Sequence, residues 1–418
     1  MVGGAEMRIV NEPVAFTCNG CGATQVSSHV ADLGPLSFWY GIKSEVAEKV
    51  LRGRNFPSRL VECEKCRLVQ QPPSSEIAEV LQFIYSTAGI NNPSAAAGSK
   101  GWGAQVVMQL REVLKGLDPA CVLEIGCGSG FLIDEWKIRG AKVAVGFEPS
   151  SAIDETPNGA TVVRDYFGVS KAREFSEHFD LIYSFGVLEH LSNVHSVVAA
   201  AAELLMPGGD FIAEMPNGEA GLMDGDLGMF AHEHLNYFTP ANLTLICEGA
   251  GLRVQRIIHN RMEIIIHARR EFPARMGSQS EPGPSGTLQA FISKGHVRQR
   301  RIKDIIRKSQ AGVAMYGACL GLCNINALLP EERRNRFGVI DSDSAKWSRE
   351  VAGVNATVSG SEGTDYSMYS DIIVVPYAFQ EEIYRYLQGR NVPCKLWRAY
   401  EGTSYTPASW EAEAVGKS

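Results

Sequence analysis

Two histidines flank a glutamate in the run His232-Glu233-His234, within residues 230–238, which also hold a tyrosine. Imidazole titrates near neutral pH, so His232 or His234 could take a proton from carbon or oxygen while Glu233 orients or polarises the reacting group. The spacing differs from the H-E-x-x-H pattern of metal-binding helices, so no metal is expected here. The alternative is that these histidines are buried and satisfied by backbone groups, but three adjacent polar groups favour catalysis. His190 is a second catalytic candidate, with a structural turn residue as its alternative.

A second motif is an acidic residue followed by three glycines at alternate positions, in the run Glu124-Ile-Gly126-Cys-Gly128-Ser-Gly130. Because glycine has no Cβ, the backbone can turn sharply there and lie against a ligand. The dinucleotide pattern G-x-G-x-x-G aims a helix at a pyrophosphate, whereas this spacing suits a nucleoside without phosphate. It resembles the first motif of the S-adenosylmethionine (SAM) methyltransferases, which implies that these four residues bind SAM.

Two later segments offer further groups to a nucleoside. Glu148 ends a predicted strand at 142–147, where a carboxylate can accept hydrogen bonds from both ribose hydroxyls. Asp165, Tyr166 and Phe167 offer a carboxylate and aromatic faces where an adenine would lie. The alternative is a Rossmann-like domain that binds no SAM.

Four cysteines form two C-x-x-C pairs, Cys18 with Cys21 and Cys63 with Cys66. Each pair can point two sulfurs at one cation, and two pairs complete a tetrahedron. Four thiolates leave no open position, so the spacing predicts a structural zinc ion that stabilises a small N-terminal domain. The chain has ten cysteines and no apolar signal-peptide core near its first residue, which predicts a reducing, cytoplasmic setting.

Apolar runs that alternate with helical stretches must position these motifs. Strands are expected near 122–125, 142–147, 179–183 and 210–215, after a turn at 205–209, with closing strands between 253 and 269. This pattern predicts an α/β fold with a doubly wound, Rossmann-like class I core. Further strands near 312–316, 336–340 and 371–375 predict a second Rossmann-like domain at the C-terminus.

The resulting domain prediction is a zinc-binding domain at residues 1–88, a SAM-dependent methyltransferase domain at 89–275, and a C-terminal Rossmann-like domain at 285–405. The basic helix expected at 288–310 should present a solvated face, with binding of a phosphate-bearing substrate as the alternative.

The composition is that of an ordinary globular protein, with 418 residues, 45% of them hydrophobic and 21% charged, and a net charge of −7. No apolar stretch approaches the ~20 residues that span a bilayer, so no membrane partner is expected. The acidic balance argues against a nucleic-acid partner and against a zinc-bearing binder of RNA or protein. NAD in the C-terminal domain is not expected, because the glycines there do not complete a dinucleotide motif. The remaining expectation is a monomer or homodimer that acts on a small molecule.

The order of these parts resembles the nucleotide-sugar C-methyltransferases over about residues 15–400. Those enzymes methylate C3 of dTDP-linked 4-keto-deoxysugars in antibiotic biosynthesis, through an enolate that attacks the methyl group of SAM. By motif position, the resemblance implies that His234 is the general base and Glu233 its acidic neighbour. It also implies that His190 and Tyr85 contribute to catalysis.

The sequence departs from that family at two places. Where the family usually has a tyrosine just before H-E-H, this chain has Ala231, which removes a hydroxyl that would help to bind the sugar or its enolate. Residues 35–56 also differ from the usual entry domain. Both departures concern the acceptor more than the chemistry. Methylation of a non-sugar metabolite at carbon, oxygen or nitrogen is therefore the second hypothesis.

Overall fold

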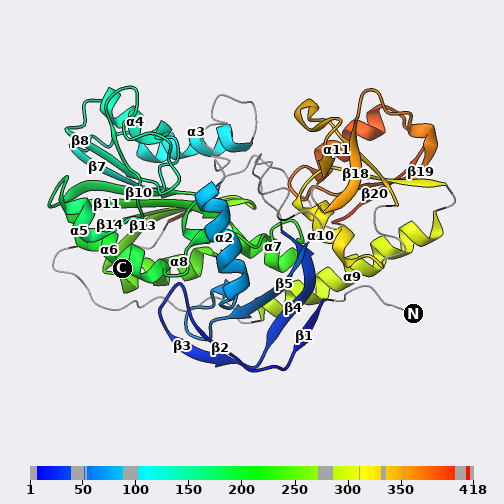
Figure 1. The fold of residues 1–418 in the computed structure, drawn as a ribbon, viewed down its shortest axis with the longest axis horizontal. Helices are drawn as coiled ribbons and strands as arrows, with labels where there is room; N and C mark the ends of the chain where they lie inside the picture. Colours follow the sequence, from blue (N-terminus) through cyan, green and yellow to red (C-terminus); the bar gives the residue numbers. More distant parts are fainter. Residues whose placement is uncertain are drawn as a thin grey trace.

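The computed structural model describes residues 7–38, 51, 54–87, 102–271, 286–309, 311–330, 336–351, 353–400 and 411–414. Its strands form sheets of eight, five and six strands and one separate hairpin (Figure 1). No helix within the described ranges is both long enough and apolar enough to cross a membrane.

The eight-stranded sheet has the order β21-β13-β14-β11-β10-β7-β8-β9. The strands from β11 to β9 run parallel, and β14, β13 and β21 are antiparallel to their neighbours. This is the strand order of a Rossmann-like class I core, extended on one side by strands that alternate in direction. The bounds are β7 (Cys121–Ile125), β8 (Val143–Phe147), β9 (Thr161–Val163), β10 (Phe179–Phe185), β11 (Leu205–Pro216), β13 (Leu252–His259), β14 (Glu263–Arg270) and β21 (Glu411–Ala414).

Helices cover both faces of this sheet, as the near-continuous apolar runs of its parallel strands require. Val122 and Leu181 face α3 (Trp102–Leu114) and α4 (Phe131–Ile138) on one side. The next residues, Leu123 and Ile182, face the other side. That side is covered by α5 (Val169–Arg173), α6 (Val194–Leu204) and α8 (Pro240–Gly249).

The turn predicted at 205–209 is wrong, because β11 already begins at Leu205. The pairing of β10 with β11 shifts register after Phe179, where Leu205 pairs before Asp210 resumes the ladder. The two glycines, Gly208 and Gly209, thus lie in an irregular strand.

The five-stranded sheet at the N-terminus takes its last strand from the methyltransferase part of the chain. Its order is β1-β4-β5-β6-β12, with β1, β4 and β5 among the blue strands of Figure 1, and β12 pairs antiparallel with β6. The bounds are β1 (Arg8–Val10), β4 (Val30–Ser37), β5 (Asn55–Glu62), β6 (Val69–Gln70) and β12 (Asn236–Tyr237), followed along the chain from β6 by α2 (Ser75–Thr87). The hairpin of β2 (Val14–Thr17) and β3 (Thr24–Ser27) carries the first cysteine pair at its turn. Because β12 follows the H-E-H segment directly, this pairing places that segment against the N-terminal sheet.

The six-stranded sheet at the C-terminus has the order β17-β18-β16-β15-β19-β20 and is parallel except for β17. Three of its strands lie where strands were expected. The bounds are β15 (Gly312–Tyr316), β16 (Gly338–Asp341), β17 (Glu350–Val351), β18 (Val354–Gly360), β19 (Tyr369–Val374) and β20 (Lys395–Arg398), with α10 (Leu320–Leu328), α11 (Gln380–Gly389) and the short helices η4 (Ser344–Lys346) and η5 (Tyr366–Met368).

The basic helix is α9 (Thr287–Lys308), which joins the C-terminal sheet to the rest of the molecule. It packs against β1, β4, β5 and α7 (Gly218–Asp224), and it shares a core with residues of the N-terminal sheet such as Leu33. The expectation of a fully solvated basic face is wrong for Arg298, which is only 8% exposed. Its guanidinium donates to the backbone carbonyls of Asp224, Gly225 and Ala399, so it ties the helix to its neighbours.

Candidate active site

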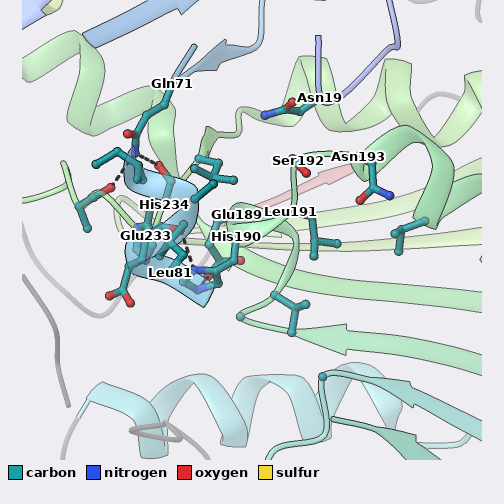
Figure 2. A pocket seen from close by; sticks show the side chains of 18 of the residues that line it. Asn19, Gln71, Leu81, Glu189, His190, Leu191, Ser192, Asn193, Glu233 and His234 are labelled. Atoms are coloured by element: carbon teal, nitrogen blue, oxygen red, sulfur yellow. Dashed lines mark hydrogen bonds and ion pairs between the residues drawn. The ribbon is translucent and has the colours of Figure 1, made fainter. Parts of the chain in front are cut away.

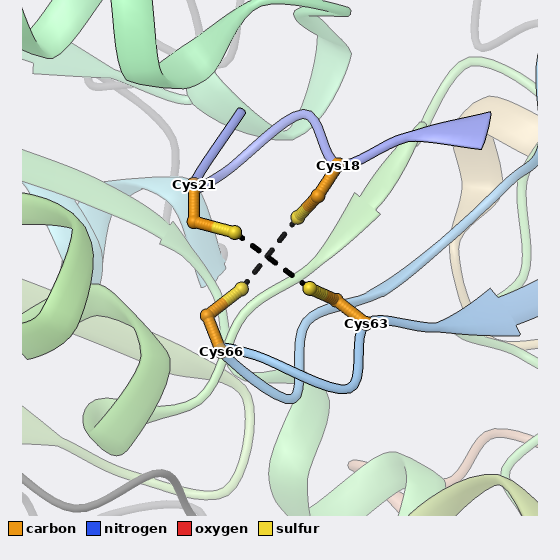
Figure 3. A group of neighbouring side chains, drawn as sticks. All are labelled: Cys18, Cys21, Cys63 and Cys66. Carbon is orange, nitrogen blue, oxygen red and sulfur yellow. Dashed lines mark hydrogen bonds between the residues drawn. The ribbon is translucent and has the colours of Figure 1, made fainter. Parts of the chain in front are cut away.

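The four predicted cysteines converge into one cluster (Figure 3). The sulfur of Cys18 lies 3.5 Å from that of Cys66, and the sulfur of Cys21 lies 3.7 Å from that of Cys63. Tetrahedral zinc with Zn–S bonds of about 2.3 Å separates its sulfurs by about 3.8 Å. The cluster therefore has the ligand type, number and spacing that a closed zinc site requires.

The glycine loop between β7 and α4 needs glycine at defined positions. Gly126 and Gly130 have φ angles of 75° and 79°, in the left-handed region that side chains disfavour. A Cβ on Gly126 would lie 2.2 Å from Cγ2 of Val187, so the loop packs tightly against the segment after β10. Gly128, between them, lines a cavity.

Glu124 lies beneath this loop and does not line the cavity. Its carboxylate accepts a hydrogen bond from the hydroxyl of Tyr183 over 2.9 Å, and burial raises the pKa of Glu124 to about 8. This hydrogen bond joins β7 to β10, which favours a structural role for Glu124 rather than direct contact with a cofactor.

Glu148 stands at the end of β8, as predicted, and lines the same cavity. Its Oε2 accepts from the backbone nitrogen of Gly128 at 3.2 Å, and its Oε1 accepts from Ser150. Tyr166 and Phe167 also line the cavity, whereas Asp165 is exposed and lies outside it. The structure thus places Glu148 and two aromatic rings, but not Asp165, where a nucleoside could bind.

The cavity has a volume of about 1310 Å³, which is larger than most sites for one small ligand. Besides the glycine loop, its wall includes Gln71 and Leu81 from the N-terminal part of the chain and Leu320 at the start of α10. Figure 2 shows Glu189, His190, Glu233 and His234 gathered along the wall beside α2. The three parts of the chain therefore meet at one cavity.

The H-E-H segment is held by Gln71, which the sequence analysis did not identify. The side-chain nitrogen of Gln71 lies 2.9 Å from the carbonyl oxygen of Ala231 and 2.7 Å from that of His234, and its backbone nitrogen donates to Leu235. Gln71 is 7% exposed, so these hydrogen bonds are shielded from water. No short motif marks such a residue, because its partners lie far away in the sequence.

His190 and His234 lie together. Their rings are 5.0 Å apart between centroids, and Nδ1 of His190 is 2.8 Å from the carbonyl oxygen of Glu233, to which it must donate. Burial lowers the pKa of His190 to about 4, and burial with the neighbouring His190 lowers the pKa of His234 to about 3. Both imidazoles are therefore neutral near pH 7.

Carboxyl groups surround these histidines. Glu233 lines the cavity, and burial raises its pKa to about 7. Glu189, at the short helix η2 (Leu188–His190), is 4% exposed, and burial and the nearby Glu214 raise its pKa well above the ordinary value. Glu214 and Glu263 also line the cavity. Among these, Glu189 could have been found from its place beside His190, whereas Glu214 and Glu263 lie within apolar strands.

His232 occupies a different place. It is 1% exposed, stacks on Phe38 at 5.2 Å between ring centroids, contacts the rings of Phe56 and Phe230, and shares a hydrogen bond of 2.9 Å with Ser58. It does not line the cavity. Its surroundings favour the structural alternative, a buried and satisfied histidine. Tyr85 lies in α2, but its side chain is outside the described residues.

Known proteins resemble this chain over its central part. Residues 104–257 match the family model of a methyltransferase domain. A ubiquinone biosynthesis O-methyltransferase of Pseudoalteromonas translucida is 30% identical over 151 residues, which are 32% of this chain and 63% of that protein. The C-methyltransferase NovU of Streptomyces niveus is 25% identical over 187 residues, which are 43% of each chain. The match thus spans less than two thirds of the length of these relatives.

A solved SAM-dependent methyltransferase from Archaeoglobus fulgidus covers 42% of this chain and 97% of its own, at 16% identity and a TM-score of 0.33. The match supports a methyltransferase domain within residues 104–257, and the strand order confirms the predicted class I Rossmann-like fold. The domain match supports the predicted enzyme and, through the methyltransferase family, SAM as its cofactor.

Proposed function

We propose that this chain transfers the methyl group of SAM to a carbon atom next to a ketone in a small molecule. The observation that carries the proposal is that one cavity is lined both by Gly126, Gly128 and Glu148 and by Glu233 and His234. Methyl transfer needs the accepting atom in contact with the sulfonium methyl, and a shared cavity meets that need. Its volume of about 1310 Å³ leaves room for an acceptor beside the cofactor.

SAM supplies an electrophilic methyl group when it is bound. On the cofactor side, we assign Glu148 to the ribose hydroxyls, because its carboxylate ends β8 on the cavity wall. Tyr166 and Phe167 would contact the adenine, and the turn at Gly126 and Gly128 would bring the backbone close to the cofactor. Glu124 would have a structural role, because its carboxylate accepts from Tyr183 in the neighbouring strand β10.

On the acceptor side, a base removes the proton next to the ketone, and the electrons of that C–H bond pass toward the ketone oxygen to form an enolate. The enolate carbon then forms the new C–C bond as the C–S bond to the methyl group breaks, and S-adenosylhomocysteine leaves. We assign the base to Glu233, because its carboxyl group lines the cavity and burial raises its pKa to about 7, near neutral pH. His234, to which the family resemblance assigns this step, has a pKa of about 3 and is the weaker base here.

The preferred acceptor is a nucleotide-linked keto-deoxysugar. The order of sequence parts supports the sugar, and the likeness to NovU, a C-methyltransferase by name, supports carbon as the methylated atom. In this proposal the four cysteines hold a structural zinc ion that stabilises the sheet carrying Gln71. The acceptor is the chain's partner, with no nucleic acid or membrane involved.

Methylation of a hydroxyl is the second candidate function. The likeness to an O-methyltransferase of ubiquinone biosynthesis supports it, and so does Ala231, which stands where the C-methylating family has a tyrosine. The two candidates share the cofactor side of the cavity and differ in whether a C–H bond must break.

Incubation in deuterated water with SAM and two panels of acceptors, keto-deoxysugar nucleotides and hydroxylated small molecules, distinguishes them. The enolate route should place the new methyl group on carbon and, with S-adenosylhomocysteine instead of SAM, should exchange the proton next to the ketone for deuterium. An oxygen-linked methyl group without exchange would support the second candidate. If neither class of acceptor is methylated, both candidate functions are rejected.

A further inference from the structure

We propose that Glu189, His190 and His234 form a binding site for a divalent transition-metal ion in the wall of the cavity. One ligand atom from each residue can be chosen so that all lie within 4.8 Å of one another. All three residues line the cavity, so a bound ion would face whatever enters it (Figure 2). The cysteine cluster is a separate set of residues in the N-terminal part of the chain.

Glu189 gives the independent sign that a ligand belongs here. It is 4% exposed, and its Oε2 is buried without a hydrogen-bond partner among the described residues. Its other oxygen, Oε1, lies 3.7 Å from Nε2 of His190. An unpaired carboxylate oxygen in such a place is costly, and a coordinated cation is one of the few groups that offset that cost.

His190 is oriented as a metal-ligating histidine usually is. Its Nδ1 donates to the carbonyl oxygen of Glu233 over 2.8 Å, so the neutral ring carries its lone pair on Nε2, the nitrogen near Glu189. Such a hydrogen bond fixes the tautomer and the ring direction of ligating histidines. The ring of His234 lies edge-on to that of His190, with 5.0 Å between the centroids.

The backbone that carries the three ligands is also fixed. Gln71 binds the carbonyl oxygen of His234 at 2.7 Å. Asn236 donates from Nδ2 to the carbonyl oxygens of Leu188 and Leu191, on either side of Glu189 and His190. Coordination geometry depends on such support from residues behind the ligands.

The ligand set indicates which ions would bind. Two imidazole nitrogens and one carboxylate oxygen, with further positions open, suit Mn²⁺, Fe²⁺, Co²⁺ or Zn²⁺ better than Mg²⁺ or Ca²⁺. This proposal differs from the sequence expectation of no metal at H-E-H. That expectation considered one segment alone, whereas the other two ligands come from η2, which lies far away along the chain.

A cation here would also take part in the proposed reaction, and this role rests on the proposed function. Its open positions would accept the ketone oxygen of the acceptor and stabilise the negative charge that develops as Glu233 takes the proton. That charge has no hydroxyl partner from position 231, because Ala231 stands there. The ion would thus supply what the departure from the resembling family removes.

The test is direct binding of Mn²⁺ to zinc-loaded full-length protein. Binding is measured as the decrease in the EPR signal of free Mn²⁺. Wild-type protein should bind one Mn²⁺ per chain. Glu189→Gln and His190→Ala should each weaken binding by at least about tenfold. Glu214→Gln removes another buried carboxylate from the same cavity and should have a much smaller effect, and His178→Ala, in a loop away from the cavity, should have none.

Cobalt gives a second measurement on the wild-type protein, which covers the case of a variant that does not fold. Co²⁺ bound by nitrogen and oxygen shows weak visible bands, whereas Co²⁺ bound by the cysteines adds strong thiolate charge-transfer bands. One metal ion per chain with only thiolate bands, or a Glu189→Gln variant that binds Mn²⁺ as wild type does, would overturn the site. Because these readouts are of binding, they remain valid even if the methyl acceptor proves not to be a ketone.

Discussion

The side-chain amide of Asn19 donates from Nδ2 to Oδ1 of Asn236 over 2.9 Å and so joins the cysteine cluster to the wall of the cavity. Asn19 follows Cys18 directly in the chain. With its Oδ1 occupied in this way, Asn236 turns its Nδ2 toward the carbonyl oxygens of Leu188 at 3.0 Å and Leu191 at 2.7 Å. One buried side chain therefore connects the cysteine cluster to the backbone around Glu189 and His190.

Replacing Asn236 by alanine should disturb both stability and the cavity. The change leaves buried carbonyl groups and the Asn19 amide without partners, so the free energy of unfolding should fall by roughly 3 kcal/mol. The rate of methyl transfer should fall further than SAM affinity does, because the moved backbone carries Glu189 and His190. Urea denaturation and kcat measurements test this. The double variant with Asn19→Ala should be less destabilised than the sum of the single variants, and strict additivity would contradict the coupling.

Glu148 and Asp165 provide a matched pair on the cofactor side. Glu148→Gln removes the carboxylate that we assign to the ribose hydroxyls and should raise the Kd for SAM by about tenfold or more, the size of one strong charged hydrogen bond. Asp165→Asn should leave the Kd unchanged, because that side chain is exposed outside the cavity. Isothermal titration of SAM into each protein measures both values. Equal effects of the two changes would argue against the assigned cofactor position.

The pH dependence of turnover identifies the base. If Glu233 takes the proton, kcat should rise about tenfold per pH unit up to about pH 7, where its carboxyl group ionises, and should then level off. If His234 takes it, the rate should be flat from about pH 5 to pH 8, because a group with a pKa of about 3 is already deprotonated there. Measurements of kcat across this pH range, with the integrity of the fold checked at each pH, distinguish the two profiles.

The same carboxyl group affects stability. Burial raises the pKa of Glu233 from 4.5 to about 7, so the folded chain binds this proton more tightly than the unfolded chain does. Its contribution to stability is complete below about pH 4.5 and is lost as the pH rises to about 7. Glu233→Gln removes this dependence, so the difference between wild type and variant should change over that interval and be constant above it.

Loss of zinc should unfold the N-terminal sheet first. The cluster fastens the β2–β3 turn to the turn after β5, and β5 continues through β6 to β12 beside the H-E-H segment. Cys66→Ser should release the metal and lower the thermal midpoint, because a structural zinc site contributes folding free energy. Metal analysis and thermal unfolding measure the two effects. Cys121→Ala, outside the cluster, should keep its zinc, and a Cys66→Ser protein with full zinc content would refute the site.

The central sheet could be predicted because its strands are apolar runs that end in glycines or acids, and both signals are local. Glu148 lies where its strand predicted it. Local signals fail where a partner comes from a distant part of the chain. His232 and His234 look alike in the sequence, yet Phe38 and Phe56 enclose the first, whereas the second faces the cavity.

Gln71 and Asn236 could not have been identified for the same reason. Each is an ordinary amide in the sequence, and its role exists only because β6 pairs with β12. A short strand of two residues carries no periodic signal, so this pairing, and with it the contact between the N-terminal sheet and the catalytic segment, depends on tertiary structure alone.

Substitution of Arg298 tests how α9 holds the C-terminal sheet to the rest of the molecule. Its guanidinium lies 4.0 Å from the ring of Tyr400 and donates to the carbonyl oxygens of Asp224, at the end of α7, and of Ala399, after β20. Arg298→Met keeps the apolar stem but leaves these carbonyl groups unpaired, so the free energy of unfolding should fall by about 3 kcal/mol. Arg300→Met, at an exposed position of the same helix, should change it by less than about 0.5 kcal/mol. Equal urea midpoints for the two variants would show that the buried guanidinium is not the fastening that its hydrogen bonds indicate.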